Sequence, residues 1–241
     1  PVKEVTISRH ASNWYVSFRI EVSSQTTEKP FDVVGVDLGI LRFATLSVGE
    51  YPDSPKPLRT LGKKLSKKQW RDRNKQIDSR NWRKAQDRIA KLHKHIADAR
   101  KTYIHGLTSY LAKNHSMVVI EDLNVKGMMQ NRRLAKVISD CGFYEFKRQL
   151  EYKTELYGSR LKLASRWFPS SKLCSSCGTK KECLPLSERT FKCSCGFECD
   201  RDLNAAINLS QIGVLHPEFT PVDKYQPPDL VEAGINQNTG S

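Results

Sequence analysis

Three acidic residues stand where the sequence leaves an apolar run or enters a predicted helix. Asp37 follows the apolar run VVGV, Glu121 follows MVVI, and Asp202 opens the predicted helix DLNAAINL. A carboxylate that follows a buried segment is costly unless it binds a cation or a hydrogen-bond donor. Hydrolysis of phosphodiesters with two metal ions needs oxygen ligands that converge from different segments of the chain. The three acids are therefore predicted to form a catalytic metal site.

Each of these acids also has an ordinary explanation. An acid at a strand end can simply reach solvent, and Asp202 can serve as the N-cap of its helix. The metal site is favoured because two strands and one helix start each deliver one carboxylate, in the chain order Asp, Glu, Asp. Asp122 and Asp200 are neighbours that could be mistaken for ligands. Side chains alternate along a strand, so Asp122 should point away from the site if Glu121 points into it.

A second group of residues has the spacing of a structural zinc site. Four thiols lie in two short pairs, each followed by a glycine that permits a tight turn: Cys174, Cys177, Cys193 and Cys195. Four thiolates close a tetrahedral site with no open position for water, so the zinc would be structural. The second pair is C-x-C instead of C-x-x-C, which leaves Cys199 or Cys183 as alternative fourth ligands. Cys141 is interpreted as an ordinary packed thiol.

The charge of the chain favours a polyanionic partner. Its 241 residues include 40 Lys and Arg against 26 Asp and Glu, a net charge of +14. This surplus is typical of nucleic-acid-binding proteins, although a ribosomal or merely soluble basic protein would share it. Residues 59–101 hold 16 basic and 4 acidic residues, so this stretch is predicted to face phosphates and not only solvent. The predicted contacts are Lys63, Lys64, Lys67, Lys68, Arg71, Arg73, Arg80, Arg83, Lys84 and Arg88.

The elements that must position these groups are strands and helices that alternate along the chain. The safest prediction is an amphipathic helix over residues 79–113, whose apolar residues recur at intervals of three and four. Helices are also expected at 140–157 and 200–213. Alternating apolar residues predict a β-hairpin over 5–22. Strands are expected at 33–39, at 42–48 beside it, at 117–123 and at 160–165.

Four motifs then identify a family. GVDLG, VIEDLNVKGM, RWFPSSKLCSSCG and DRDLNAAINL occur in this order, with the zinc cysteines running from the third motif towards the fourth. Together they resemble the TnpB family, insertion-sequence proteins long described as OrfB transposases and related to type V CRISPR effector nucleases. The similarity spans roughly residues 1–212. It implies an α/β fold with an RNase H-like (RuvC) mixed sheet, flanking helices, an inserted zinc ribbon and an N-terminal hairpin.

The resemblance also implies roles for individual residues. In the family an Asp, a Glu and an Asp hold Mg²⁺ ions that cut DNA at a site chosen by pairing with a guide RNA. These positions match Asp37 of GVDLG, Glu121 of VIEDL and Asp202 before LNAA, which would hold two Mg²⁺ ions. Arg189, near the zinc module, is a candidate assisting residue. The basic region 59–101 would line the groove for the guide–target heteroduplex.

The resemblance divides the chain into parts with separate expectations. These are the end of a wedge-like β-barrel (1–29), a RuvC-like domain with a long basic helical insertion (30–168), a zinc ribbon (169–199), the final helix (200–213) and a disordered tail (214–241). Because the chain begins with Pro and enters the family pattern at the last strands of that barrel, it is expected to be a piece of a longer protein. The regions that recognise the target motif and make many of the contacts with the guide RNA would then lie in other parts of that longer protein.

Two other functions compete with a guided nuclease. One is a remnant that binds zinc and nucleic acid without cutting. The other is a transposase that joins strands itself, although such enzymes usually present their acids in the order Asp, Asp, Glu. No apolar run is long enough to span a bilayer and the first residues lack a signal peptide, so a location in the prokaryotic cytoplasm is expected. The oligomeric state stays open.

Overall fold

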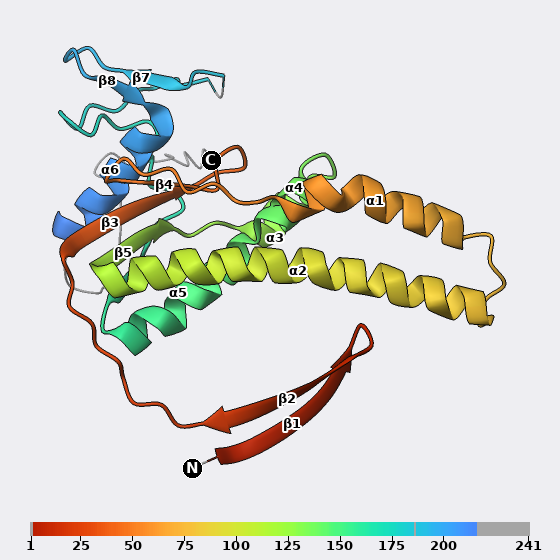
Figure 1. Ribbon diagram of the computed structural model, residues 1–241. Helices are drawn as coiled ribbons and strands as arrows, with labels where there is room; N and C mark the ends of the chain where they lie inside the picture. The colour runs from red at the N-terminus through yellow and green to blue at the C-terminus, as the bar shows by residue number, and fades with distance from the viewer. Residues whose placement is uncertain (1, 186, 216–241) are drawn as a thin grey trace, which may run out of the picture.

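The computed structural model of the chain describes residues 2–185 and 187–215 (Figure 1). The final helix, α6 (Arg201–Leu215), continues to Leu215 instead of ending at residue 213 as predicted. The remainder of the predicted disordered tail, from residue 216 onward, lies outside the described residues. Among the described helices, none is both long enough and apolar enough to cross a bilayer.

A four-stranded sheet in the order β4-β3-β5-β6 forms the centre of the molecule. β3 (Phe31–Leu38), β5 (His115–Glu121) and β6 (Arg160–Ala164) run parallel, and β4 (Ala44–Leu46) pairs antiparallel with β3. The predicted strands and the mixed α/β class are therefore confirmed. Parallel strands place their carboxyl ends at the same edge of a sheet, which brings the segments after β3 and β5 together.

Side-chain alternation gives this sheet two different buried faces. Val34 and Val36 of β3, with the matching residues of β5, pack into the main core beneath helices α2 and α5. Val33 and Val119 face the other way, towards α6, where Leu209 is fully buried. Because successive residues of a strand point to opposite faces, Asp37 and Glu121 share the α6 face with Val33 and Val119.

Close packing of α6 on the sheet depends on glycine. A Cβ atom at Gly35 would lie 2.0 Å from the carbonyl oxygen of Ala206 and 2.5 Å from the amide nitrogen of Ser210. Only a residue without a side chain lets the helix backbone approach β3 so closely. This approach brings the start of α6 to the edge of the sheet where Asp37 and Glu121 lie.

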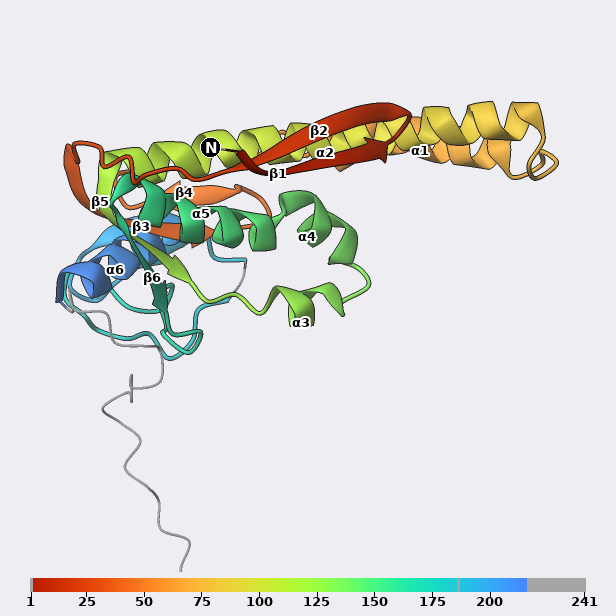
Figure 2. The same cartoon turned by 90° about the horizontal axis from the view of Figure 1, so that it is seen from below.

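Helix α2 (Arg80–Asn114) connects the sheet to a projecting arm. It begins where predicted, since the Ser79 side chain accepts a hydrogen bond from the Trp82 amide at 3.2 Å. Its last turns cover the sheet, while its first turns pack on α1 (Pro57–Asp72) through a small apolar cluster containing Leu65 and Ile89. Figures 1 and 2 show the two helices extending side by side from the body of the molecule. The sequence analysis had not predicted α1 as a helix.

The other elements refine the predictions. The helix predicted over 140–157 is broken: Gly142, with a φ of 75°, ends α4 (Ala135–Cys141) and begins α5 (Phe143–Tyr157). A Cβ atom at Gly142 would come within 2.8 Å of the Arg100 side chain, so the turn requires glycine. The remaining short elements are α3 (Val125–Met129), β7 (Thr190–Lys192) and β8 (Glu198–Asp200).

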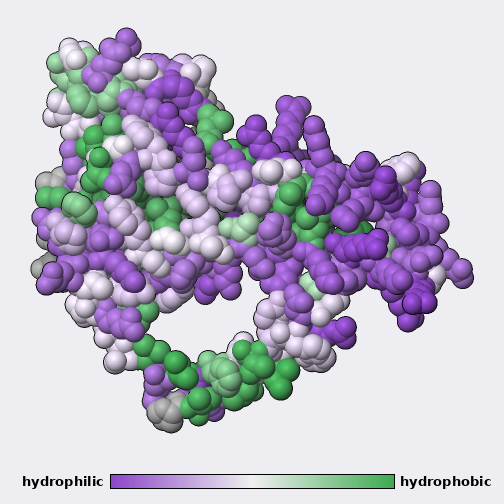
Figure 3. All heavy atoms as spheres, in the orientation of Figure 1, coloured by the Kyte–Doolittle hydropathy of each residue, from purple (hydrophilic) through white to green (hydrophobic). Residues whose placement is uncertain are grey.

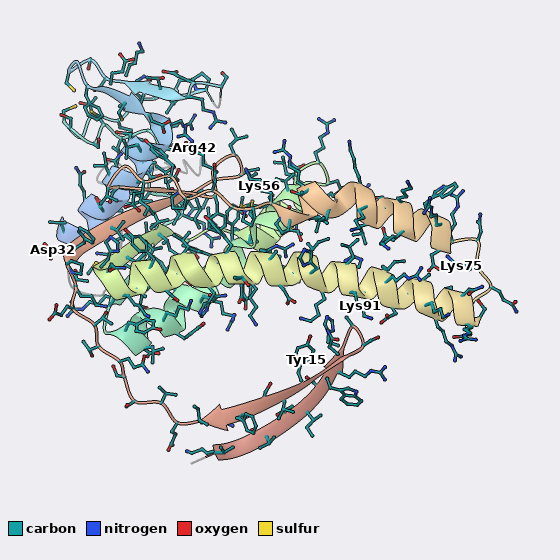
Figure 4. All side chains as sticks on the ribbon, in the orientation of Figure 1. Tyr15, Asp32, Arg42, Lys56, Lys75 and Lys91 are labelled. Atoms are coloured by element: carbon teal, nitrogen blue, oxygen red, sulfur yellow. The ribbon has the colours of Figure 1, made fainter. Side chains whose placement is uncertain are left out.

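The predicted hairpin forms from β1 (Val2–His10) and β2 (Asn13–Ile20). One of its faces is apolar, with the partners Ile7 and Val16 exposed by 67% and 54%, and Figure 3 shows this apolar strip below the hydrophilic arm. The opposite face turns to the arm, where the ammonium of Lys94 lies 5.0 Å from the ring of Tyr15 (Figure 4). The hairpin is thus attached to α2 through polar contacts and stays outside the core.

Candidate functional site

The structure brings the three predicted acids together at the edge of the sheet where the parallel strands end. This edge, with Asp37, Glu121 and Asp202, is the acidic edge. Val36 of β3 pairs with Ile120 of β5, so Asp37 and Glu121 each follow the last paired residue of neighbouring parallel strands. They point to the face covered by α6, whose first turn contains Asp202. Asp122 takes the opposite face, as alternation predicted, and accepts hydrogen bonds from Lys147 at 3.0 Å and Arg166 at 2.7 Å.

The electrostatics of this edge show that the acids interact. Asp37 keeps part of its surface open to solvent, but the protein packed around its carboxylate raises its pKa well above the ordinary value. The charges of Glu121 and Asp202 raise the pKa of Asp37 further. Burial also raises the pKa of Glu121, and the hydrogen bond from Ser170 opposes that shift. A buried carboxylate whose pKa is raised by neighbouring carboxylates forms a ready site for a cation.

Asp200, and not Asp202, caps the start of α6. The Asp200 carboxylate accepts hydrogen bonds from the amides of Asp202 at 2.9 Å and Leu203 at 3.2 Å. Asp200 is itself held by Arg42, whose guanidinium lies 2.9 Å away and stacks over Tyr51. Because Asp200 satisfies the helix start, the Asp202 side chain is left available for the site.

Arg189 lies where an assisting cation would be needed. Its guanidinium is 4.0 Å from the Asp202 carboxylate and is more than half exposed. A second guanidinium, that of Arg201, lies near enough for its charge to lower the pKa of Asp37, which opposes the shift caused by burial. Arg189 lies inside the cysteine module, directly before β7, and Arg201 is the first residue of α6, so both parts contribute positive charge to an acidic edge.

The cysteine module is fastened to the acidic edge by buried polar residues that the sequence analysis missed. Ser170 donates to the Glu121 carboxylate at 2.5 Å, and its backbone oxygen accepts from Asn208 at 2.7 Å. Asn204 and Asn208 both donate to the carbonyl of Leu173, at 2.6 and 2.8 Å. The signal that could have revealed them is the spacing of the two asparagines, four residues apart on one face of α6.

The four predicted cysteines form one cluster in space. The sulfur atoms of Cys174, Cys177, Cys193 and Cys195 all lie within 4.8 Å of one another. Cys183 is exposed and Cys199 packs beside the cluster with its thiol 3.2 Å from the Asp200 carbonyl, so neither joins it. Cys141 is buried in the main core, as expected of a packed thiol. A donor set of four sulfurs fits a closed tetrahedral zinc site.

The chemistry of these thiols agrees with a site for a cation. Hydrogen bonds with Thr179 lower the pKa of Cys177 to about 6, so this sulfur is readily ionised at neutral pH. A backbone hydrogen bond at Cys195 lowers the pKa of Cys193 as well. Thiolates, not thiols, bind zinc, and a lowered pKa reduces the cost of forming them.

The predicted nucleic-acid contacts all lie on the projecting arm. Five occupy α1 and four occupy α2, while Arg73 caps the end of α1. Nine of the ten are exposed and Lys68 is half-buried. Within the described part of the chain, only Arg83 among them pairs with an acid, Asp78 at 3.9 Å. Figure 4 shows Lys75 at the tip of the same arm. The basic surface is therefore largely uncompensated, as the sequence predicted.

Comparison with protein-family models gives two matches. Residues 17–132 match OrfB_IS605, described as "Probable transposase". Residues 143–209 match the TNB domain of the Cas12f1-like family. The first match covers the segment that holds Asp37 and Glu121, and the second covers the cysteines and Asp202.

Curated relatives agree with these matches. A "Putative RNA-guided DNA endonuclease" of Streptomyces pristinaespiralis is 41% identical over 211 residues, covering 87% of this chain and 52% of the relative. The "Putative RNA-guided DNA endonuclease InsQ" of Escherichia coli K12 is 33% identical, covering 88% of this chain and 57% of the relative. The chain thus spans about half the length of the curated relatives it matches.

Solved structures share the fold. The chain is similar to a protein in a Cas12f1–sgRNA–target DNA complex, with a TM-score of 0.54 and 20% identity over 86% of this chain and 55% of that one. A CRISPR–Cas12f ternary complex gives a TM-score of 0.55, again at 20% identity, over 82% of this chain and 41% of that one. At this level of identity the similarity concerns the fold.

Proposed function

Because the chain belongs to the TnpB family, we propose that it is the nuclease portion of an RNA-guided DNA endonuclease. The observation that supports this most is the convergence of Asp37, Glu121 and Asp202 at one edge of the sheet. The parallel strands β3, β5 and β6 with an antiparallel neighbour agree with an RNase H-like domain of the RuvC type. The reaction would be metal-dependent hydrolysis of phosphodiester bonds in DNA.

The three acids would hold two Mg²⁺ ions. Hard divalent cations prefer carboxylate oxygens, and a cluster whose members raise the pKa of Asp37 gains stability when a cation neutralises it. When bound, such ions supply an activated water and stabilise the leaving oxygen. The residues of the chain position the ions: Ser170 fixes one oxygen of Glu121, and Asp200 frees Asp202 from capping. Arg189 would add positive charge beside the phosphate.

The cysteine cluster would hold one structural Zn²⁺ ion through Cys174, Cys177, Cys193 and Cys195. Its role would be positional, because the cluster has no open site for water. The loop that carries Ser170 precedes the first cysteine pair, and Asn204 of α6 accepts a hydrogen bond from the Ser175 amide at 3.0 Å. A bound zinc would therefore keep Ser170 and α6 in position next to Glu121.

The partners proposed for the chain are a DNA target and a guide RNA. The exposed cations of α1 and α2 would contact the backbone of the guide–target heteroduplex without reading its sequence. The proposed domains are the hairpin region 1–29 as the end of a wedge-like barrel, a nuclease domain at 30–168 with the basic arm inserted, a zinc ribbon at 169–199 and the final helix from 200.

Cleavage of labelled single-stranded DNA in Mg²⁺ tests the proposal, with and without co-purified RNA. The parent is compared with Asp37→Ala, Glu121→Ala and Asp202→Ala, and with Asp32→Ala as a matched control, since Asp32 is an exposed acid at the other end of β3. We expect each of the first three to reduce cutting by at least about a hundredfold, since each removes a metal ligand. Retained cutting in these variants would refute the assignment.

A parent chain that binds DNA without cutting in any divalent metal would instead favour a nucleic-acid-binding remnant. Restoring the parts of the longer relatives that this chain does not span would then separate the two explanations. If the longer protein cuts and its Asp37→Ala variant does not, the site is a nuclease site. If the longer protein also fails to cut, the remnant function stands.

A further inference from the structure

A cavity of about 410 Å³ lies beside the acidic edge. Glu121 forms part of its wall, and Leu38, the residue after Asp37, forms another part. The rest of the lining comes from α5, from the segment that leads from β5 into α3, and from Arg166 after β6. A strand of nucleic acid bound at the acids would therefore pass next to this cavity.

The lining of this cavity combines an apolar floor with a cationic rim. The floor consists of side chains from β5, the following loop and α5, including Ile120, Leu123 and Phe143. The rim carries four cations: Lys126, Lys147, Arg148 and Arg166. Small-ligand pockets are commonly 300–1,000 Å³ with apolar walls and a few placed polar groups. An apolar floor below cations suits the flat ring of a nucleobase joined to a phosphate.

Two of the rim cations are held in place by Asp122. Its carboxylate pairs with Lys147 at 3.0 Å and with Arg166 at 2.7 Å, and both contacts lower its pKa. Arg148 is fixed in a similar way by Glu145 at 2.7 Å. Lys126 forms no ion pair within the described residues and is exposed. The rim thus has fixed cations on one side and one free cation on the other.

Tyr144 supplies an aromatic ring at the mouth of the cavity. It lies on α5 one helical turn before Lys147 and Arg148, and it is 70% exposed although it lines the cavity. An exposed phenol ring beside cations offers a stacking surface for a base of any sequence. The other two described hollows lie between α1 and α2 and between α5 and β6, and neither includes any of the three acids.

From these observations we propose that the cavity receives one unpaired base next to the scissile phosphate, stacked on Tyr144, with its phosphates bound by Lys126 and Arg166. A base inside a duplex cannot enter, so the preferred substrate strand is single-stranded at this point. The proposal rests on the proposed nuclease function and adds to it a binding place for one base beside the scissile phosphate. It makes Tyr144 a positioning residue, because it contacts the base and not the reacting atoms.

Photo-crosslinking tests this without depending on cutting. Single-stranded oligonucleotides with 5-iodouracil at one position each are bound to the full chain with Ca²⁺ in place of Mg²⁺, irradiated, and mapped by mass spectrometry. One position is expected to crosslink to Tyr144, and a fully paired duplex with the same base is not. Tyr152→Ala is the matched control, since Tyr152 lies on the same helix outside this cavity. It should keep the crosslink, whereas Tyr144→Ala should lose it.

Removal of the base provides a second measurement. An abasic site at the crosslinking position should weaken binding to the parent roughly tenfold, the size expected when one stacked base is lost, and should change binding to Tyr144→Ala much less. Equal losses in both proteins, or crosslinks only to the exposed Trp167, would overturn the proposal. A failure of the proposed function itself appears elsewhere, as cutting that survives Asp37→Ala.

Discussion

The acidic edge and the cysteine cluster are two groups of side chains that can become anions, and they differ in burial and in what positions them. The carboxylate of Asp37 is surrounded by protein at the end of a strand, where burial raises its pKa. The thiol of Cys177 is exposed on a loop, where hydrogen bonds with Thr179 lower its pKa. The acids are positioned by the core whether or not a cation is present. The module that carries the thiols has few apolar contacts, a cluster built around Leu184 and Phe191, and would depend on its ion.

The largest expected effect is loss of the ion from the cysteine cluster. Removing zinc with a strong chelator, or replacing Cys177 with Ser, should unfold residues 169–199 while the sheet stays folded. Structural zinc sites are worth about 10–16 kcal/mol in small peptides, far more than a cluster of this size can replace. Amide hydrogen exchange that rises in the module and stays low in β3 and β5 would confirm the difference.

Cys183→Ser is the matched control for that experiment. Cys183 is an exposed thiol of the same module and lies outside the cluster, so its loss should leave zinc content and exchange unchanged. A preparation made without chelator that contains well below one zinc per chain would contradict the assignment. In that case the two regions would be alike in needing no ion to fold.

A smaller effect is expected when the hydrogen bonds that join α6 to the cysteine module are removed. Asn208 is buried and donates to the carbonyls of Ser170 and Leu173, so Asn208→Leu leaves both acceptors without this partner. The Leu173 carbonyl keeps its hydrogen bond from Asn204, so the Ser170 carbonyl is the acceptor left unsatisfied, and the free energy of unfolding should fall by about 1–3 kcal/mol. Chemical denaturation measures this. Asn81→Leu, an exposed position on α2, is the control and should change stability little.

Asn208→Leu also tests whether the contact between α6 and the cysteine module affects DNA cleavage. If Asn208 positions Ser170 against Glu121, Asn208→Leu should lower cutting in folded protein more than it lowers DNA binding. Equal losses of both would indicate that the contact only stabilises the fold.

The smallest expected effect is a gain in stability. The folded-state pKa of Asp37 is raised, so its contribution to stability is fully present below the pKa of the unfolded chain and is lost as the pH rises through the folded value. In metal-free protein near pH 7, Asp37→Asn should therefore raise the Tm, by about 2–4 °C if the gain is roughly 1 kcal/mol. The difference from the parent should shrink as the pH falls towards 4.

Saturating Mg²⁺ should reverse the order of the two proteins, because only the parent gains stability from the ion. Glu4→Gln serves as the control, since Glu4 is an exposed acid of the hairpin. An Asp37→Asn protein that is less stable than the parent without metal would show that the acids are stabilised by something other than a cation.

Much of the candidate site could be predicted from the sequence because its signals are local. The cost of burying a carboxylate is enough to single out Asp37 and Glu121, each at the end of an apolar run. The C-x-x-C spacing of Cys174 and Cys177 is enough to predict that both thiols face one metal ion. The helix over 79–113 was predicted almost to its last residue, since an apolar period and the cap at Ser79 act within a few residues. The domain boundaries and the ligand roles remain proposals.

Other features depended on which segments meet in space. Asp200 caps α6 in place of Asp202, and no spacing distinguishes two acids that both precede a helix. Gly142 breaks a helix whose apolar period continues, because its backbone adopts a φ of 75°, a conformation that residues with side chains rarely take. The partners of Asp122 come from α5 and from the segment after β6, far along the chain.

The sequence by itself determined which groups could bear charge and which elements carry them, since composition and periodicity act over a few residues. Only the tertiary structure decided how those groups are used. The approach of α6 to Gly35 and the parallel pairing of β3 with β5 set Asp202 beside Asp37 and Glu121. Such contacts join residues more than eighty positions apart, and their energies depend on packing that no local pattern records.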